Sequence, residues 1–175
     1  TPRPKVDWPH RAAILAHDRE LAGTGITTVF DALRVGSVIS VGRNAYEPYA
    51  LESAAALDSL RENGQLKIDH YIHLRAEICS ETLAEELAEF GPEDRVGIVS
   101  MMDHTPGQRQ FTRMDKYAEY YQGKYGMNDA ELERFIEEKR INQQRYSAQN
   151  RVAIVDRCRG RGIPMASHDD ATPEH

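Results

Sequence analysis

The sequence predicts an α/β fold in which four βα units place parallel strands in one sheet. Three observations support this prediction. Short β-branched or apolar segments occur four times in the 175 residues, a segment with helical periodicity precedes each of them, and glycine or proline lies between the two. Strands that alternate with helices form parallel sheets through right-handed crossovers. An open doubly wound sheet and part of a (β/α)₈ barrel both fit, and four units are about half of a complete barrel.

The first two units occupy the N-terminal part of the chain. Helical spacing of apolar residues predicts helices over 8–25 and 46–62, and Gly25 ends the first of them. The segment "ITTVFDAL" is short and β-branched, so a buried strand is expected near 26–31. The segment "KIDHYIHLRAE" predicts a second strand at roughly 67–77, in which successive side chains alternate between two faces.

Helix caps and turn residues define the last two units. Ser80 is a good N-cap for a helix that Gly91 and Pro92 end, and "RVGIVSMMD" after it predicts the third strand. A short helix is expected in "RMDKYAEYYQGKYG". Asn128 and Glu131 form a capping box, which predicts a long helix, with or without a break. The segment "IPMASHDD" that follows is the fourth strand.

Composition and charge are typical of a globular cytoplasmic domain. Apolar residues make up 40% of the chain and charged residues 29%, and the formal net charge is -6. This charge argues against nucleic acid and acidic membranes as partners, and no apolar run approaches the ~20 residues of a membrane span. Cys79 and Cys158 form no paired motif, so we expect reduced thiols. Neither an initiator methionine nor a signal peptide is visible, so we expect a processed chain or one cut from a longer protein.

Polar side chains lie at the end of each predicted strand. In parallel α/β folds, functional residues gather at the carboxyl ends of strands. Any one of these residues could be a helix cap or a structural histidine, but four polar strand ends together favour a site for Zn²⁺ or a similar divalent ion. His70 and His73 fall on opposite faces of their strand, and we expect His73 to face inward. The strand-end residues are Asp31, His73, Arg75, Glu77, Asp103, His104, His168, Asp169 and Asp170.

A basic segment with four interleaved tyrosines follows the third strand and supports two interpretations. It could be an amphipathic helix with a mixed surface, or a phosphate clamp, since a planar guanidinium binds two phosphate oxygens at once. The chain has no Walker loop and no GxGxxG motif, so side chains would hold the phosphate. The candidate substrate-binding residues are Arg109, Arg113 and Lys116 of this segment, Arg75 of the second strand, and Arg3 and Lys5 near the N-terminus.

Six stretches of the chain, in order and nearly end to end, resemble the PhnM family of phosphonate-metabolism proteins. They are "TPRPKVDWP", "GITTVFDA", "HLRAE", "MDHTPGQRQF", "KYAEYYQGKYG" and "ASHDDAT". The fourth and the last are the specific ones, whereas "GITTVFDA" alone would be weak. The family is a branch of the amidohydrolase superfamily of metal-dependent hydrolases.

The resemblance implies a distorted TIM barrel with a binuclear metal site at its carboxyl face, with zinc expected first and manganese or iron as alternatives. It implies hydrolysis of α-D-ribose 1-methylphosphonate 5-triphosphate to pyrophosphate and the ribose methylphosphonate 5-phosphate. Carried over to this chain, Glu77 would bridge the metal ions, and His104 and His168 would bind them. Asp169 and Asp170 are the candidate catalytic residues, which would orient His168 or the attacking water.

The resemblance also implies parts that these residues do not contain. The first-strand metal ligands would precede Thr1, and the last-strand aspartate that acts as general base would follow His175. We therefore expect the central portion of the family protein, about half a barrel, which is inactive by itself. The expected partner is a phosphorylated sugar phosphonate. Unpaired sheet edges would pair with a second copy, which predicts a homo-oligomer.

Three alternatives stay open on the sequence. The first is a C–N hydrolase of the amidohydrolase type, in which the basic segment is only surface. The second is a non-enzymatic α/β module that binds an anion or a partner. The third is a structural fragment without activity. A phosphate-rich substrate separates the first alternative from the diphosphatase, and metal content separates the second.

Overall fold

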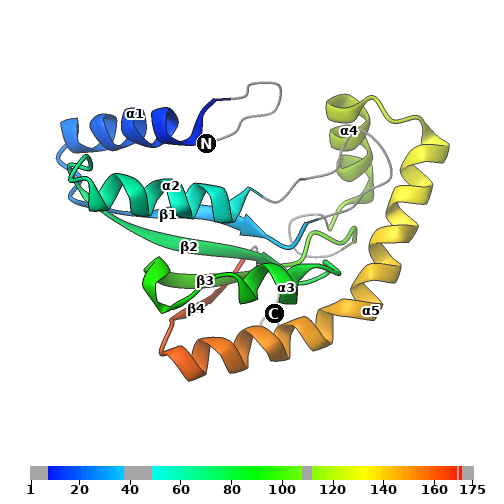
Figure 1. Ribbon diagram of the computed structural model, residues 1–175. Helices are drawn as coiled ribbons and strands as arrows, with labels where there is room; N and C mark the ends of the chain where they lie inside the picture. The colour runs from blue at the N-terminus through cyan, green and yellow to red at the C-terminus, as the bar shows by residue number, and fades with distance from the viewer. Residues whose placement is uncertain (1–7, 38–48, 108–111, 169, 171–175) are drawn as a thin grey trace.

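The computed structural model describes residues 8–37, 49–107, 112–168 and 170, and it contains one parallel sheet of four strands (Figure 1). The strands lie side by side in chain order: β1 (Thr28–Val35), β2 (Asp69–Glu77), β3 (Val96–Met102) and β4 (Met165–Ser167). The helices are α1 (His10–Gly23), α2 (Ala50–Glu62), α3 (Leu83–Ala88), α4 (Met114–Tyr125) and α5 (Asp129–Arg161), with a 3₁₀ turn at Pro92–Asp94. The predicted α/β class with four parallel strands is confirmed, and the arrangement is consistent with part of a barrel.

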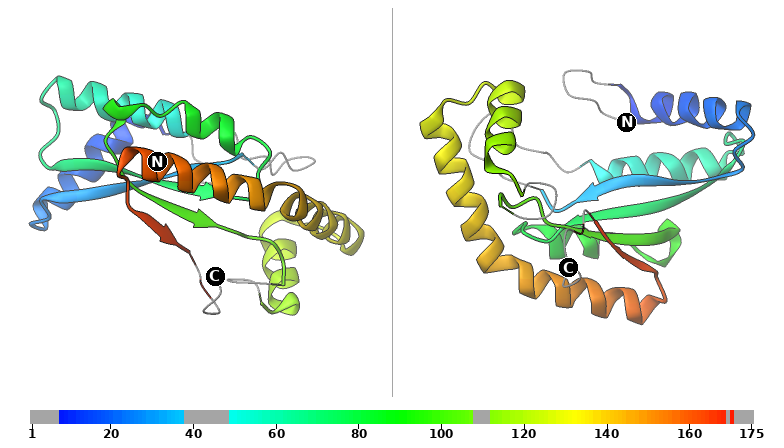
Figure 2. Two further views of the ribbon diagram at one scale, coloured as in Figure 1. Left: turned by 90° about the horizontal axis from the view of Figure 1, so that it is seen from below. Right: turned by 180° about the vertical axis from the view of Figure 1, so that it is seen from behind.

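The helices α2, α3 and α5 cover one face of the sheet, and the apolar core lies between them and the strands (Figure 2). Alternation along β2 places Ile72, Leu74 and Ala76 in this core, where each is at most 1% exposed. Leu57 of α2 and Ile154 of α5 belong to the same core, so helices far apart in the sequence share it. Burying a large aliphatic side chain contributes about 1.5–3 kcal/mol, so this face is the main source of stability.

The opposite face of the sheet carries polar and aromatic side chains, and several of them are only partly buried. Tyr71, His73 and Arg75 alternate with the core residues of β2, whereas His70 is buried on the helix-covered face, as the strand periodicity predicts. Phe30 of β1 is 50% exposed and stacks on Tyr71 with ring centroids 5.6 Å apart. Within the described ranges, β1 and β4 each pair on one side only and form the two edges of the sheet.

The first strand is longer than the sequence predicts. β1 pairs with β2 along all of its residues as far as Val35, whereas the prediction ends the strand near residue 31. Asp31 is therefore in the middle of the strand, and its carboxylate contacts His70 on the helix-covered face. The expectation that Asp31 belongs to the strand-end cluster is wrong. The residue that approaches the strand end on the other face is Arg34.

The helix starts include one wrong prediction and one confirmed prediction. Ser80 does not cap α3, because its hydroxyl donates to the carbonyl of Ser37 and accepts from the amide of Thr82, and the helix starts after Thr82. Asn128 does cap α5: its side chain accepts from the amide of Glu131 at 3.0 Å, and the Glu131 carboxylate accepts from the Asn128 amide at 2.9 Å. α5 then continues for 33 residues without a break. In the described ranges, neither α5 nor another helix combines the length and apolar character that a membrane span requires.

A buried network of ionisable side chains joins α1 to the sheet. Asp18 of α1 is fully buried, and its carboxylate accepts hydrogen bonds from the amides of Lys67 and Ile68 at 2.8 and 3.1 Å. His70 lies between two carboxylates, with ring nitrogens 3.3 Å from Asp18 Oδ1 and 2.6 Å from Asp31 Oδ2. Burial raises the pKa of Asp18, but these hydrogen bonds outweigh it and hold the pKa below its usual value. The network therefore fixes α1 to the segment that begins β2.

The charge on His70 should make the stability of the chain depend on pH. Burial lowers the pKa of His70, but the hydrogen bonds and charges of Asp31 and Asp18 outweigh it and raise the pKa above its ordinary value of 6.5. The stabilisation is therefore complete below about pH 6.5 and is lost as the pH rises through the raised pKa. We expect the melting temperature to fall as the pH rises above about 6.5, and a His70→Gln variant to lack this part of the decline. If the melting temperatures of the two proteins change with pH in the same way, His70 is not charged in the folded chain.

Candidate functional site

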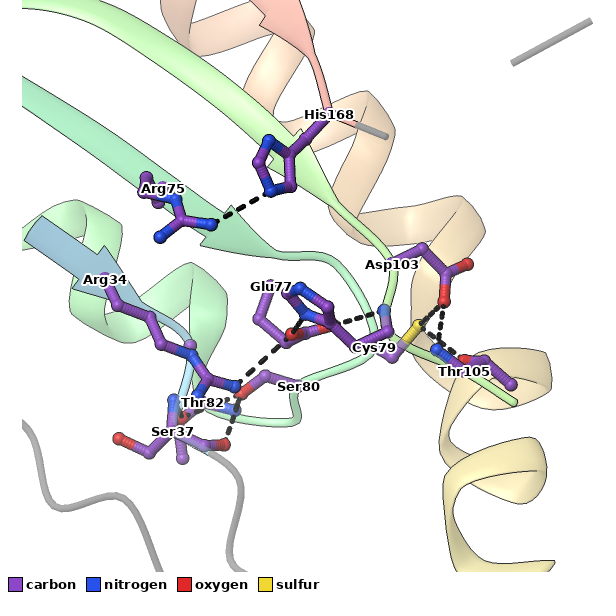
Figure 3. Close-up of polar contacts among 12 residues, drawn as sticks. Arg34, Ser37, Arg75, Glu77, Cys79, Ser80, Thr82, Asp103, Thr105 and His168 are labelled. Carbon is purple, nitrogen blue, oxygen red and sulfur yellow. Dashed lines mark hydrogen bonds and ion pairs between the residues drawn. The ribbon is translucent and has the colours of Figure 1, made fainter. Parts of the chain in front are cut away.

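Three of the predicted ligand residues lie at the carboxyl ends of neighbouring strands, and two of them, Glu77 and His104, are in contact. The register pairs Glu77 with Met102 across β2 and β3, so His104 follows the end of β3 close to Glu77. β4 pairs with β3 through Ser167, which brings His168 to the same end of the sheet. The rings of His104 and His168 have centroids 6.2 Å apart. Figure 3 shows Glu77 and His168 at these strand ends.

Glu77 is the central residue of this arrangement. Its side chain is 1% exposed, and its Oε2 lies 2.5 Å from His104 Nδ1. Arg34 donates to the same oxygen at 3.3 Å, and the amide of His104 donates to Oε1 at 3.3 Å. Burial raises the pKa of Glu77, but the hydrogen bond from His104 and the surrounding positive charges outweigh it and hold the pKa below its usual value. Glu77 is therefore a buried, ionised carboxylate that requires positive charge beside it.

His168 approaches the same region with Arg75 beside it. Arg75 donates from Nη2 to His168 Nε2 at 3.0 Å, so in this arrangement Nε2 accepts and a neutral ring carries its proton on Nδ1. Nε2 can bind a metal ion only after the guanidinium moves. This contact links a predicted substrate-binding residue directly to a predicted metal ligand.

A second set of metal-binding atoms adjoins Glu77. The Cys79 thiol donates to Asp103 Oδ1 at 3.2 Å, and ligand atoms of Glu77, Cys79 and Asp103 all lie within 4.8 Å of one another. The amide of Thr105 and the side-chain amide of Gln143 each donate to Asp103 at 3.0 Å. Burial and the charge of Asp103 raise the pKa of the Cys79 thiol well above its ordinary value, so the sulfur keeps its proton at neutral pH. A metal ion bound there would have to displace that proton.

The donor set at the strand ends fits a divalent metal ion. Carboxylate oxygen and imidazole nitrogen are ligands for Zn²⁺, Mn²⁺ and Fe²⁺, and a thiolate favours Zn²⁺ among these. Glu77 and His104 could hold the ion, with His168 on one side and Asp103 and Cys79 on the other. Arg34 is the counter-ion of the Glu77 carboxylate among the residues that the structure describes, with Nη2 3.3 Å from Oε2.

The described part of the basic segment has the contacts of an ordinary helix surface. Arg113 pairs with Asp115, and Lys116 Nζ lies 2.5 Å from Glu119 Oε2. Both cations are more than half exposed. Among the described residues, neither cation forms a hydrogen bond or ion pair with the strand-end cluster. Their role in phosphate binding stays a prediction.

The remaining predicted site residues lie near or outside the limits of the described ranges. The Asp170 carboxylate lies 2.5 Å from the hydroxyl of Ser167, at an exposed position. The other residues are outside the described ranges, and they are Arg3, Lys5, Arg109 and Asp169.

Sequence reasoning does not identify several side chains of this region. Arg34 follows once the first strand is extended to residue 35, because it then lies near the strand end on the face of Glu77. Cys79 lies in the turn after β2, where strand alternation no longer predicts which way a side chain points. Gln143 and Lys139 lie one turn apart in a strongly polar helix, where single charges give little indication of burial.

The chain is similar to the alpha-D-ribose 1-methylphosphonate 5-triphosphate diphosphatase of Escherichia coli (strain K12). The two are 41% identical over 175 residues, which are all of this chain and 46% of that protein. The chain thus spans about half the length of the curated relative it matches, and its resemblance to the PhnM family is confirmed. Neither a family model nor a solved structure matches the chain.

Proposed function

From this similarity, we propose that the chain is part of a metal-dependent diphosphatase that acts in phosphonate catabolism. The substrate is α-D-ribose 1-methylphosphonate 5-triphosphate, and the reaction releases pyrophosphate. The observation that carries the proposal is the shared strand end of Glu77, His104 and His168, in a chain 41% identical over its whole length to an enzyme of that name. The superfamily and the barrel are those of the amidohydrolases, and zinc is the first choice of metal.

In this proposal Glu77, His104 and His168 would hold the metal ions, with Glu77 as the carboxylate that the ions would share. Metal ions held there would lower the pKa of a bound water and polarise a phosphoryl oxygen. Glu77 orients the imidazole of His104 through the 2.5 Å contact with Nδ1. Arg75 donates to His168 before a ligand enters, and its guanidinium would then turn to the phosphate oxygens. Asp170, with Asp169, would orient His168 or the attacking water.

The negative charge of the triphosphate requires several cations during cleavage. Among the residues that the structure describes, Arg75 is the predicted substrate-binding residue that contacts the strand-end cluster. We propose that basic residues of the segment after β3 and of the N-terminal segment complete the phosphate site. These residues are Arg109, Arg113, Lys116, Arg3 and Lys5.

The expected test is release of pyrophosphate from α-D-ribose 1-methylphosphonate 5-triphosphate with added Zn²⁺ or Mn²⁺. We propose that the remaining metal ligands and the general base lie outside residues 1–175. We call a protein that continues beyond residues 1–175 on both sides the extended protein. It should hydrolyse the triphosphate and lose this activity when a chelator removes the metal. The 175-residue chain alone should not hydrolyse the triphosphate.

Two results would contradict this proposal. Turnover by the 175-residue chain at the rate of the extended protein would show that the additional segments are not needed. Hydrolysis of an amide or another C–N bond in place of the triphosphate would favour the amidohydrolase-type alternative.

A further inference from the structure

A buried lysine next to the strand-end cluster lacks a counter-ion within hydrogen-bonding distance. Lys139 lies in the first third of α5 and is 7% exposed. Neither a hydrogen bond nor an ion pair connects its Nζ to a residue of the described ranges, and the ring of Phe135 lies 5.6 Å away. Lysine is almost never buried without a partner, because removing an unpaired charge from water is unfavourable. This position therefore calls for an anion that the described residues do not supply.

Contacts of α5 place Lys139 beside the strand ends. Gln143, one turn further along the same face of the helix, donates to Asp103 at 3.0 Å. Asn150, about three turns from Lys139, donates to two carbonyl groups of the segment after β2 at 2.8 and 2.9 Å. Burial lowers the pKa of Lys139, and among the charged groups of the cluster the carboxylates of Glu77 and Asp103 oppose this effect while Arg34 adds to it.

The two carboxylates of the cluster already have other partners. Glu77 accepts hydrogen bonds from Arg34 and contacts the ring of His104. Asp103 accepts from a backbone amide, from Gln143 and from a thiol. Neither carboxylate is within ion-pair distance of Lys139 Nζ, so the ammonium remains available for a further negative group at the same site.

We infer that Lys139 binds the phosphate oxygens of the ligand at this site, on the side of the cluster covered by α5. The inference rests on the proposed function and deepens it, because it assigns a polyphosphate contact to a helix that carries no predicted site residue. A lysine ammonium suits this role as a compact point charge with three donors, which can serve phosphate oxygens in more than one geometry. The unfavourable burial of the unpaired charge is then relieved when the ligand enters.

The test uses matched substitutions at neighbouring positions. Lys139→Met removes the charge and keeps an apolar side chain of similar length, and Arg140→Met is the control, because Arg140 is exposed and carries the same charge. The probe is inorganic pyrophosphate, titrated calorimetrically into the extended protein with Mn²⁺ present. Lys139→Met should weaken binding by about tenfold or more, as expected for a lost charged hydrogen bond, and Arg140→Met by less than about twofold.

Stability distinguishes a ligand-binding lysine from a structural one. Because the ammonium is unpaired, Lys139→Met should leave the urea midpoint unchanged or raise it. A Lys139→Gln variant repeats the binding test with a polar side chain, in case the methionine variant folds poorly.

Loss of pyrophosphate affinity in both Lys139 variants, but not in Arg140→Met, supports the inference. It does so even when the extended protein fails to hydrolyse the ribose triphosphate, and then only the proposed function fails. Unchanged pyrophosphate affinity in both Lys139 variants overturns the inference. This holds even if the unsubstituted extended protein hydrolyses the ribose triphosphate, and then only the inference fails. Absence of pyrophosphate binding to the unsubstituted protein overturns it as well.

Discussion

Glu77→Gln should remove bound metal from the extended protein and lower kcat/KM by more than about 100-fold. Substitution of residues that only orient metal ligands costs about 10–100-fold, so loss of the proposed bridging carboxylate should exceed that range. Glutamine has nearly the shape of glutamate but no negative charge. It would therefore leave Arg34 and the proposed metal ions without the carboxylate that they share.

The control for this substitution is Glu85→Gln, which makes the same chemical change at an exposed position of α3. Elemental analysis of the purified proteins and pyrophosphate release should agree: Glu85→Gln keeps both metal and turnover, and Glu77→Gln loses both. Retention of metal and of kcat in Glu77→Gln would remove Glu77 from the proposed metal centre.

Asp18→Ala should be the most destabilising single substitution in the network that joins α1 to the sheet. It leaves two backbone amides of the segment before β2 without their acceptor, and it removes one of the two carboxylates that flank His70. Removing one partner of a buried charged group costs about 3–5 kcal/mol, and we expect a loss of unfolding free energy in that range. Urea unfolding of the 175-residue chain measures this loss.

Two further variants define the origin of that loss. Glu20→Ala changes an exposed carboxylate of the same helix and should alter stability by less than about 0.5 kcal/mol. Asp18→Asn keeps an oxygen acceptor for the amides but removes the charge beside His70, and it should fall between the two. A midpoint for Asp18→Ala equal to that of Glu20→Ala would show that the network does not stabilise the fold.

The α/β class and the position of each strand could be predicted because the alternation of helix and strand is periodic and repeated. The ends of helices and strands were harder to predict where a side chain forms a hydrogen bond to a distant part of the chain. Serine is common at helix N-caps, but the Ser80 hydroxyl joins two loop segments instead. One of its partners, Ser37, is far away in the sequence, so the residues around Ser80 do not reveal this contact. Asp31 resembled a strand terminus because an acidic residue is unusual within a strand, but the buried His70 on the next strand satisfies it.

Some residues of the candidate site could be predicted from the sequence, and others could not. Glu77, His104 and His168 could be brought together from sequence, because carboxyl ends of parallel strands always share one edge of the sheet. The position of Lys139 could not be predicted, because its proximity to the cluster depends on how the long helix α5 packs against the sheet. A charged residue in a polar helix gives no sign of burial until its partners, such as Gln143 and Asp103, are placed.

The order β1-β2-β3-β4 repeats the order of the strands along the chain. Each strand therefore adds to an edge that the preceding segment has already supplied, and no strand has to be inserted later between two others. A chain leaves the ribosome N-terminus first, at about 5–20 residues per second, which is slow compared with local folding. The sheet can thus grow in the direction of synthesis, and a nascent chain that ends after β3 already contains the strands around Leu74 and Glu77. The strand that brings His168 is the last of the four to emerge, so the strand-end cluster is completed only after the sheet that supports it.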